Sequence, residues 1–206
     1  MAEGNDHGIA TLANITLRPE QSADYRENEN VTREAFWNHH VPGCYEHYLL
    51  HIMRSSPAFV QELDFVAVYN GRIISNAVYA KSIVKTDSGI ESEMLGLGPI
   101  SVLPQYQRIG VGSRLIEHTK QIACELGYRA IFLYGDPAYY SQHGFVPAER
   151  FDIRTSDNMY AEALQVYELY ENALSGITGC YFEDEVYEID GAAAAEFDNL
   201  FLRRRK

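Results

Sequence analysis

Residues 107–112, QRIGVG, could bind a phosphate group through the polypeptide backbone. Two glycines within three residues let the chain turn sharply and direct several amide N–H groups toward one point. Apolar residues at helical spacing follow from Ser113 to Leu126, and Gly127 ends that pattern. The first amides of a helix lack partners within it and carry the positive end of its dipole. The loop therefore predicts a phosphate or pyrophosphate site made of backbone amides rather than lysines.

The spacing of the glycines excludes two common nucleotide-binding motifs. A dinucleotide fingerprint, G-x-G-x-x-G, needs a third glycine where this chain has Leu115. A Walker loop needs a lysine directly after its last glycine, and no lysine lies between Lys85 and Lys120. A tight turn without a ligand remains the alternative for so short a motif.

The loop and the sequence after it resemble the GNAT superfamily, the GCN5-related N-acetyltransferases. The signature of that family is Gln/Arg-x-x-Gly-x-Gly/Ala between a strand and a helix, and residues 107–112 fit each constrained position. Residues 135–145, GDPAYYSQHGF, resemble the family's short helix with Tyr-x-x-x-Gly-Phe. The sequence of this segment resembles most the subgroup of YhbS-like predicted acetyltransferases. The resemblance covers roughly residues 14–155 and is most specific over residues 97–145.

The order of elements along the chain agrees with this resemblance, which implies an α/β (α+β) fold with one mixed central β-sheet and helices on both faces. The predicted elements are a strand at 15–18, helices at 22–38 (N-cap Ser22) and 44–54, a hairpin of strands 65–69 and 72–85 around Asn70-Gly71, a fourth strand from the turn at 86–89 to the loop, the helix after the loop, strands at 130–134, 163–170 and 180–189, and a last helix starting at 192–195.

We expect a single domain over residues 14–206, after a flexible N-terminal tail at residues 1–13. Its core would span residues 14–155, and C-terminal strands with an acidic segment would occupy residues 156–206.

The resemblance implies that acetyl-CoA is the co-substrate. The acetyl and pantetheine arm would pair with the backbone of the fourth strand, and the pyrophosphate would bind the loop amides. The residues implied are Ile100, Ser101 and Val102 for the arm, and Gln107, Arg108, Ile109, Gly110, Val111, Gly112 and Ser113 for the pyrophosphate and its loop.

Acyl transfer to an amine requires a neutral amine, a polarised carbonyl and a proton for the leaving thiolate. Tyr140 lies four residues before Gly144, where the family has its tyrosine, and this favours Tyr140 as the general acid. An ordinary core tyrosine is the alternative. The neighbouring Tyr139 is a second candidate, but successive residues of a helix point in different directions.

The sequence does not identify a general base. Some members of the superfamily have a glutamate on the fourth strand, fourteen residues before the first loop glycine, and that position is Gly96 in this chain. Glu91 and Glu93 lie earlier on the strand. A base acting through water, or an amine that is already neutral, would serve instead.

The acceptor in this fold lies against the first two helices and their connection. The residues expected to contact a small-molecule or peptide amine are Trp37, Glu46 and Glu62. The cluster of His39, His40, Cys44 and His47 contains residue types that can bind zinc. Its spacing does not match a closed zinc site, and we expect no metal.

The net charge of −12 argues against a nucleic-acid partner, which would require clustered Lys and Arg. Residues 157–202 contain eleven acidic residues and no Lys or Arg. They would either attract a cationic amine or form a solvated surface. The basic residues 203–206 are too few to indicate a nucleic-acid site.

The sequence contains no apolar run long enough to span a membrane and no signal-peptide pattern, so we expect a cytoplasmic protein. Its three cysteines are widely spaced and are expected to be reduced thiols. The chain could be a monomer or a homodimer. The favoured function is an acetyl-CoA-dependent N-acetyltransferase, and the alternative is a non-catalytic acyl-CoA-binding or sensing module.

Overall fold

The computed structural model describes residues 10–39 and 42–202. Residues 1–9 of the predicted tail, which spans residues 1–13, and the basic residues 203–206 lie outside the described residues. The strands are β1 (Thr16–Pro19), β2 (Phe65–Tyr69), β3 (Arg72–Lys85), β4 (Glu91–Val102), β5 (Ala130–Tyr134), β6 (Val146–Pro147), β7 (Ile153–Arg154), β8 (Leu164–Glu168) and β9 (Gly179–Phe182). The α-helices are α1 (Tyr25–Phe36), α2 (Glu46–Met53), α3 (Val111–Glu125), α4 (Pro137–Tyr140) and α5 (Gly191–Asp198).

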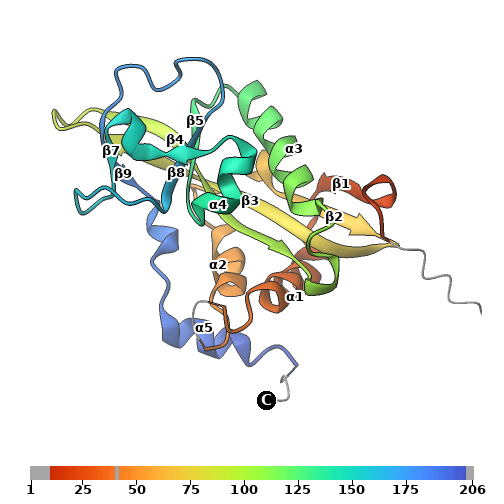
Figure 1. The fold of residues 1–206 in the computed structure, drawn as a ribbon. Coiled ribbons are helices and arrows are strands. Elements are labelled where there is room, and N and C mark those ends of the chain that lie inside the picture. Colours follow the sequence, from red (N-terminus) through yellow and green to blue (C-terminus); the bar gives the residue numbers. More distant parts are fainter. Residues whose placement is uncertain (1–9, 40–41, 203–206) are drawn as a thin grey trace, which may run out of the picture.

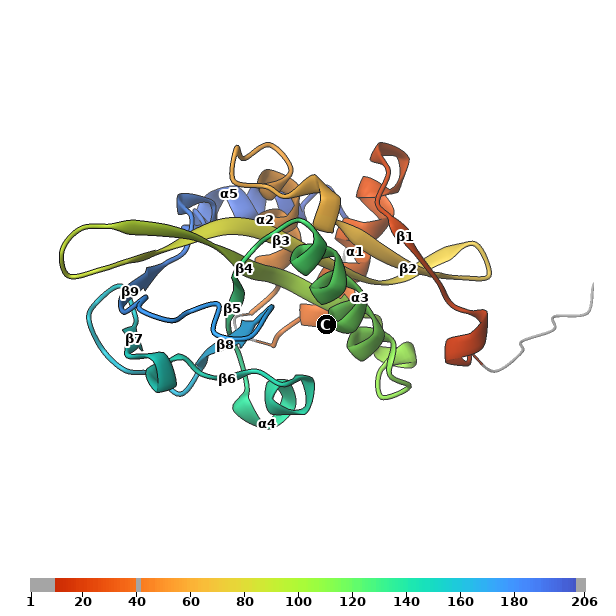
Figure 2. The ribbon, with the colours of Figure 1, turned by 90° about the horizontal axis from the view of Figure 1, so that it is seen from above.

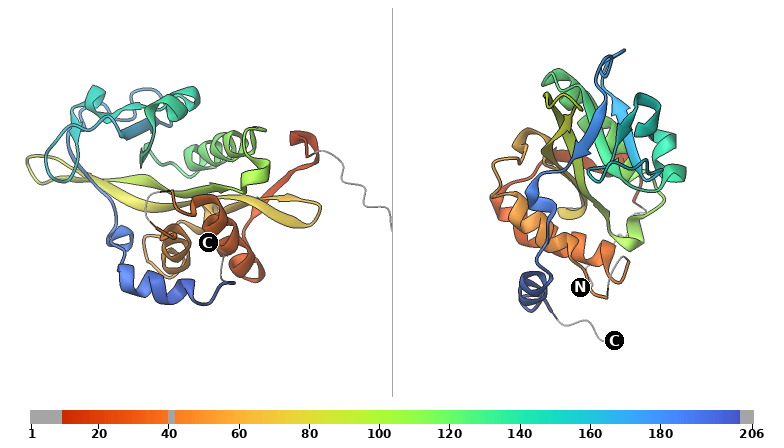
Figure 3. Two further views of the ribbon diagram at one scale, coloured as in Figure 1. Left: turned by 60° about the horizontal axis from the view of Figure 1, so that its bottom comes forward. Right: turned by 90° about the vertical axis from the view of Figure 1, so that its left-hand side faces the viewer.

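The strands form one mixed nine-stranded sheet, which confirms the predicted fold class (Figure 1). Its main path is β1-β2-β3-β4-β5-β8-β6, with β9 beside β3 and β7 beside β9. Within the described chain, only β4–β5 and β7–β9 pair in parallel. Helices α1, α2 and α5 cover one face of the sheet, and α3 and α4 cover the other (Figures 2 and 3).

Side chains alternate between the two faces along each strand, so neighbouring residues enter different cores. On the α3 face, Tyr79 and Leu95 pack with Leu115 of α3. On the opposite face, Ala80 packs with Leu50 of α2. This alternation decides which side of the sheet each candidate residue reaches.

The hairpin between β2 and β3 is confirmed to the residue. Asn70 and Gly71 both have positive φ, 48° and 75°, as a type I′ turn requires. The predicted helix at 22–38 begins differently, because residues 22–24 form a 3₁₀ turn before α1. Gln21 caps this turn in a reciprocal capping box with Asp24, so the prediction of Ser22 as N-cap is wrong.

Strand β4 contains the irregularity that opens the sheet. Tyr79 pairs with Leu97 while Ala77 pairs with Ile100, so one residue of β3 faces the two residues 98–99 of β4. Strand β5 pairs with β4 only through Leu95 and Gly96. Beyond Gly96, the backbone of β4 on the β5 side has no strand partner within the described chain. A gap therefore opens between β4 and β5 toward the end of β4.

The C-terminal segment returns across the face that carries α1 and α2. The predicted strand at 180–189 stops at Phe182, because Asp184 turns the chain by accepting a hydrogen bond from Val186 N at 3.0 Å. Helix α5 then packs beside α2, with the Phe197 ring 5.3 Å from that of His47. None of the helices in the described part of the chain combines the length and apolar character that crossing a bilayer requires.

Candidate active site

The loop between β4 and α3 presents an uncapped helix N-terminus. Gly110 is the N-cap residue of α3, and its φ of 89° is a left-handed conformation that favours glycine. No side chain in the described residues caps this end. The first backbone bond of the helix runs from Arg114 N to Gly110 O at 3.0 Å. The amides between these residues are therefore available to an anion.

Contacts on both sides hold this loop in place. The Gln107 side-chain amide donates to Val102 O at 3.1 Å and ties the loop to the end of β4. On the other side, the Arg114 guanidinium donates to the carbonyls of Leu12 and Ile15 at 2.6 and 2.7 Å. Leu12 and its neighbours, which the sequence assigned to the tail, form a 3₁₀ helix at Leu12–Asn14 against the loop.

The three strand residues predicted to bind the coenzyme arm do not face the same way. Ile100 and Val102 pack against the α3-side core. Ser101 is buried on the opposite side, where its hydroxyl donates to Thr32 Oγ1 at 3.0 Å. Its carbonyl also accepts from Ser75 Oγ at 2.6 Å. The Ser101 side chain therefore contacts α1 and does not face the α3 side of the sheet.

Tyr140 is the last residue of α4, the short helix that follows β5, and it packs on the α3 face of the sheet. Asp136 caps α4 by accepting from Ala138 N at 2.9 Å. The Tyr140 ring packs directly over Gly135, where an added Cβ would lie 2.3 Å from the ring. The Tyr140 ring also packs against Phe145, with ring centroids 5.6 Å apart. Burial raises the pKa of Tyr140 to about 12, so the phenol holds its proton at neutral pH.

Tyr139 points elsewhere, as the helical geometry predicts. Its side chain is exposed, and its ring is nearly perpendicular to that of Tyr140. Its hydroxyl lies 3.3 Å from the position of a Cβ on Gly112 and forms a hydrogen bond with Ser113. Tyr139 therefore belongs to the surroundings of the α3 N-terminus.

Neither glutamate near the expected position of the base is unpaired. Glu91 forms an ion pair with Lys85, and Glu93 forms one with Lys81, each at 3.1 Å. Gly96 itself faces two phenols of the C-terminal segment. A Cβ at this position would lie 2.9 Å from Tyr181 Oη and 3.5 Å from Tyr187 Oη. Sequence reasoning missed these tyrosines, because no local spacing links them to Gly96.

The residues predicted to contact the acceptor are only partly brought together. Trp37 stands at the end of α1, with the Arg33 guanidinium 4.3 Å from its ring centroid. Glu46 begins α2 and accepts from Tyr45 N at 3.0 Å. Glu62 lies apart from both, beside Tyr128 near the C-terminal end of α3. The α1–α2 connection is therefore the better candidate for acceptor contact.

The histidine and cysteine cluster has other roles in the fold. His47 is buried with its Nε2 3.2 Å from Asp198 Oδ1, and burial lowers its pKa to about 4. Burial also raises the pKa of the Cys44 thiol to about 12. His40 lies outside the described residues. Among the described residues, no three metal-binding side chains come together.

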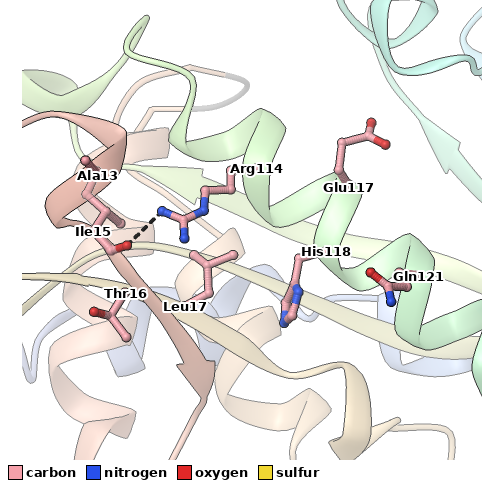
Figure 4. A pocket seen from close by; sticks show the side chains of 8 residues that line it. All are labelled: Ala13, Ile15, Thr16, Leu17, Arg114, Glu117, His118 and Gln121. Carbon is pink, nitrogen blue, oxygen red and sulfur yellow. Dashed lines mark hydrogen bonds between the residues drawn. The ribbon is translucent and has the colours of Figure 1, made fainter.

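A groove of about 600 Å³ lies between β1 and α3 (Figure 4). Arg114 and His118 of α3 and Leu17 of β1 line it. None of the residues predicted to bind coenzyme or acceptor does, so this groove is separate from the candidate site.

Comparisons with known proteins agree with the loop and the fold. The model of the acetyltransferase (GNAT) domain matches residues 61–147. The uncharacterized N-acetyltransferase YhbS of Escherichia coli K12 is 31% identical over 109 residues, which are 53% of this chain and 64% of YhbS. YjhQ of the same strain, also named an uncharacterized N-acetyltransferase, is 32% identical over 90 residues, 41% of this chain and 46% of YjhQ. The chain thus matches less than two thirds of either relative.

Solved structures extend the likeness over most of the fold. The Escherichia coli YhbS structure, in complex with CoA, has a TM-score of 0.76 at 27% identity and covers 86% of this chain and 94% of its own. A GNAT family acetyltransferase from Brucella melitensis, in complex with acetyl-CoA, has a TM-score of 0.66 at 23% identity, covering 84% and 97%. With the uncapped glycine loop between β4 and α3, these matches show a GNAT acetyltransferase domain at residues 61–147 and, over most of the chain, a fold like that of the YhbS structure.

Proposed function

We propose that the chain is an acetyl-CoA-dependent N-acetyltransferase that acetylates a primary amine of a small molecule or peptide. One observation carries this proposal: the uncapped N-terminus of α3 stands where the gap between β4 and β5 opens. The binding of CoA by YhbS and of acetyl-CoA by the Brucella melitensis protein supports it.

The residues around the gap suit both halves of the coenzyme. The amides of Val111, Gly112 and Ser113 would hold the pyrophosphate, assisted by the positive end of the helix dipole. The exposed Arg108 stands beside them with a positive φ of 64°. The unpaired backbone of β4 beyond Gly96 offers an edge to the amide groups of the pantetheine arm. Acetyl-CoA supplies the acetyl group as an activated thioester.

Tyr140 supplies the proton that a leaving thiolate needs. Its raised pKa keeps the phenol protonated at neutral pH, and its ring is fixed between Gly135 and Phe145. Such a group lowers the barrier because it donates its proton while the carbon–sulfur bond breaks.

A non-catalytic acyl-CoA sensor remains the second candidate, because Gly96 supplies no carboxylate. Thiol release from acetyl-CoA over a panel of primary amines separates the two functions. Turnover with any amine above the rate of hydrolysis supports the enzyme. Tight calorimetric binding of CoA without such turnover would establish the sensor and overturn the enzyme.

We further propose that residues 14–206 act as one domain and that the acceptor is cationic. The acidic C-terminal segment supports the second point only in part, because some of its carboxylates have structural partners. Asp198 pairs with Arg33 at 2.5 Å, and Asp184 and Asp190 cap helical turns. The remaining acids are the ones that could attract a cation. A cytoplasmic location is part of the same proposal.

A further inference from the structure

The apex of the gap between β4 and β5 receives its polar groups from the C-terminal segment. The last paired residues there are Gly96 of β4 and Phe132 of β5. Tyr181 stacks on Phe132 with ring centroids 4.5 Å apart, and its hydroxyl lies against Gly96. Tyr187 Oη approaches Gly96 O at 3.5 Å. A longer side chain at position 96 would have no room.

Glu183 follows directly in this segment. Phe182 pairs with Ile83 in antiparallel register, so the chain after it runs along β3 toward the level of Ala80 and Gly96. Residues two apart on an extended chain share a side, which places Glu183 on the side of Tyr181.

The negative charge of Glu183 acts on the three phenols near the apex, those of Tyr134, Tyr181 and Tyr187. Burial is the main reason that the pKa values of Tyr134, Tyr181 and Tyr187 are raised, and the negative charge of Glu183 raises each of them further. The Tyr134 and Tyr181 rings are 6.2 Å apart. Two other carboxyl groups act in this region, Asp157 on Tyr134 and Asp184 on Tyr187.

The Glu183 carboxyl is also chemically suited to accept a proton. Unlike Glu91 and Glu93, it has no described Lys or Arg as an ion-pair partner. Its residue is exposed, yet the surrounding protein raises its pKa to about 6 by desolvation. A carboxyl with such a pKa is mostly ionised at neutral pH and is a stronger base than an ordinary glutamate.

We propose that Glu183 is the general base of acetyl transfer and takes the proton of the acceptor amine on the sheet face opposite Tyr140. This inference rests on the proposed function. The amine nitrogen forms a bond to the acetyl carbon with its lone pair, while its proton passes to the Glu183 carboxylate. The carbon–sulfur bond breaks, and the sulfur takes the phenolic proton of Tyr140. Both residues then recover their starting states by proton exchange with water.

The two faces follow from strand alternation. Tyr140 packs with the α3-side core, whereas Phe132, Tyr181 and Gly96 belong to the opposite side. Acid and base therefore approach the gap from different directions, as an attacking nitrogen and a departing sulfur require.

The test compares Glu183→Gln with Glu185→Gln, a matched change at an exposed neighbouring glutamate. Thiol release is measured from pH 5.5 to 9 with acetyl-CoA and the amine turned over fastest in the panel. We expect Glu183→Gln to lower kcat/KM by about 10²-fold or more and to abolish the acid limb near pH 6. Glu185→Gln should behave as wild type.

A readout independent of turnover is the carboxyl titration followed by NMR of ¹³C-glutamate-labelled protein. A signal that titrates near pH 6 in wild type and is missing in Glu183→Gln supports the inference. A Glu183 signal at the ordinary glutamate pKa overturns it, as does an unchanged pH profile in an active Glu183→Gln enzyme. If wild type turns over no amine, the proposed function itself fails and the base fails with it.

Discussion

The two sides of the candidate site are built in different ways. The proposed coenzyme side comes from one contiguous stretch, from the end of β4 through α3 to α4, and it would act through backbone amides and one phenol. The proposed acceptor side is assembled from α1 and α2, from Gly96 and from Tyr181, Glu183 and Tyr187. A contiguous site built on backbone geometry leaves a local signature, whereas one assembled from distant side chains does not.

The physical reason lies in what each side must bind. A phosphate needs several N–H groups at one point, and only a few turns with glycine at fixed positions provide them. An amine and its proton need one carboxylate at the right place, which any segment reaching the apex can supply.

Replacing Tyr140 with Phe should lower kcat by about 10²–10⁴-fold, the usual value of general acid catalysis. The ring and its packing on Gly135 are kept, so stability and CoA affinity should change little. Thiol release and calorimetric titration measure the two quantities.

Tyr139→Phe is the matched control at the next residue of α4. Its hydroxyl faces Ser113 and not the buried side of α4, so a smaller loss is expected. A larger defect in Tyr139→Phe than in Tyr140→Phe would transfer the acid to the other tyrosine.

Gly110→Val should weaken CoA binding by about 10–100-fold, because a β-branched residue at a φ of 89° costs about 1–3 kcal/mol and displaces the loop amides. The added Cβ would also meet Leu12 Cδ1 at 3.4 Å. Gly127→Val is the control. Its φ of 85° gives the same backbone strain at the other end of α3, with no described atom within 4 Å of the Cβ. Equal CoA affinities in the two variants would contradict the loop assignment.

Gly96→Ala should destabilise the protein by about 1–3 kcal/mol, since the new methyl lies 2.9 Å from the buried Tyr181 hydroxyl. Urea denaturation measures the change. Adding Tyr181→Phe removes the opposing oxygen and should recover part of the loss. Gly96→Glu, which introduces the carboxylate found in some relatives, should lower activity. A gain in activity would show that the apex has room for a base on β4.

The sequence predicted the parts whose causes are local. Asn70-Gly71 defines the β2–β3 hairpin. The loop glycines mark the start of α3, and Gly127 marks its end. It did not predict the end of β9 at Phe182, because the turn that ends the strand depends on one cap by Asp184. Nor could the sequence show that Glu62 lies away from Trp37 in the fold, because their positions depend on how the sheet divides the molecule into two layers.

The smallest effect is expected where α5 meets α2 on the acceptor side. His47 is fully buried there, and its neighbour Asp198 is already paired with Arg33 at 2.5 Å. Neither ring nitrogen of His47 forms a hydrogen bond with the described residues. Burial therefore outweighs the attraction of Asp198, and the folded protein keeps the ring neutral with a pKa of about 4.

This lowered pKa fixes the sign of the pH dependence. Between the ordinary histidine pKa of about 6.5 and the folded value of about 4, the unfolded chain binds more protons than the folded one. The contribution of His47 to stability is thus complete above pH 6.5 and is lost as the pH falls toward 4. In a chain of this length, each kcal/mol lost lowers Tm by about 2–4 °C. His47→Leu removes the titrating group. As the pH falls from 6.5 to 4, the Tm of wild type should therefore decrease more than the Tm of the variant. A larger decrease in the variant would mean that His47 is charged and paired with Asp198, and that α5 is held to α2 by an ion pair.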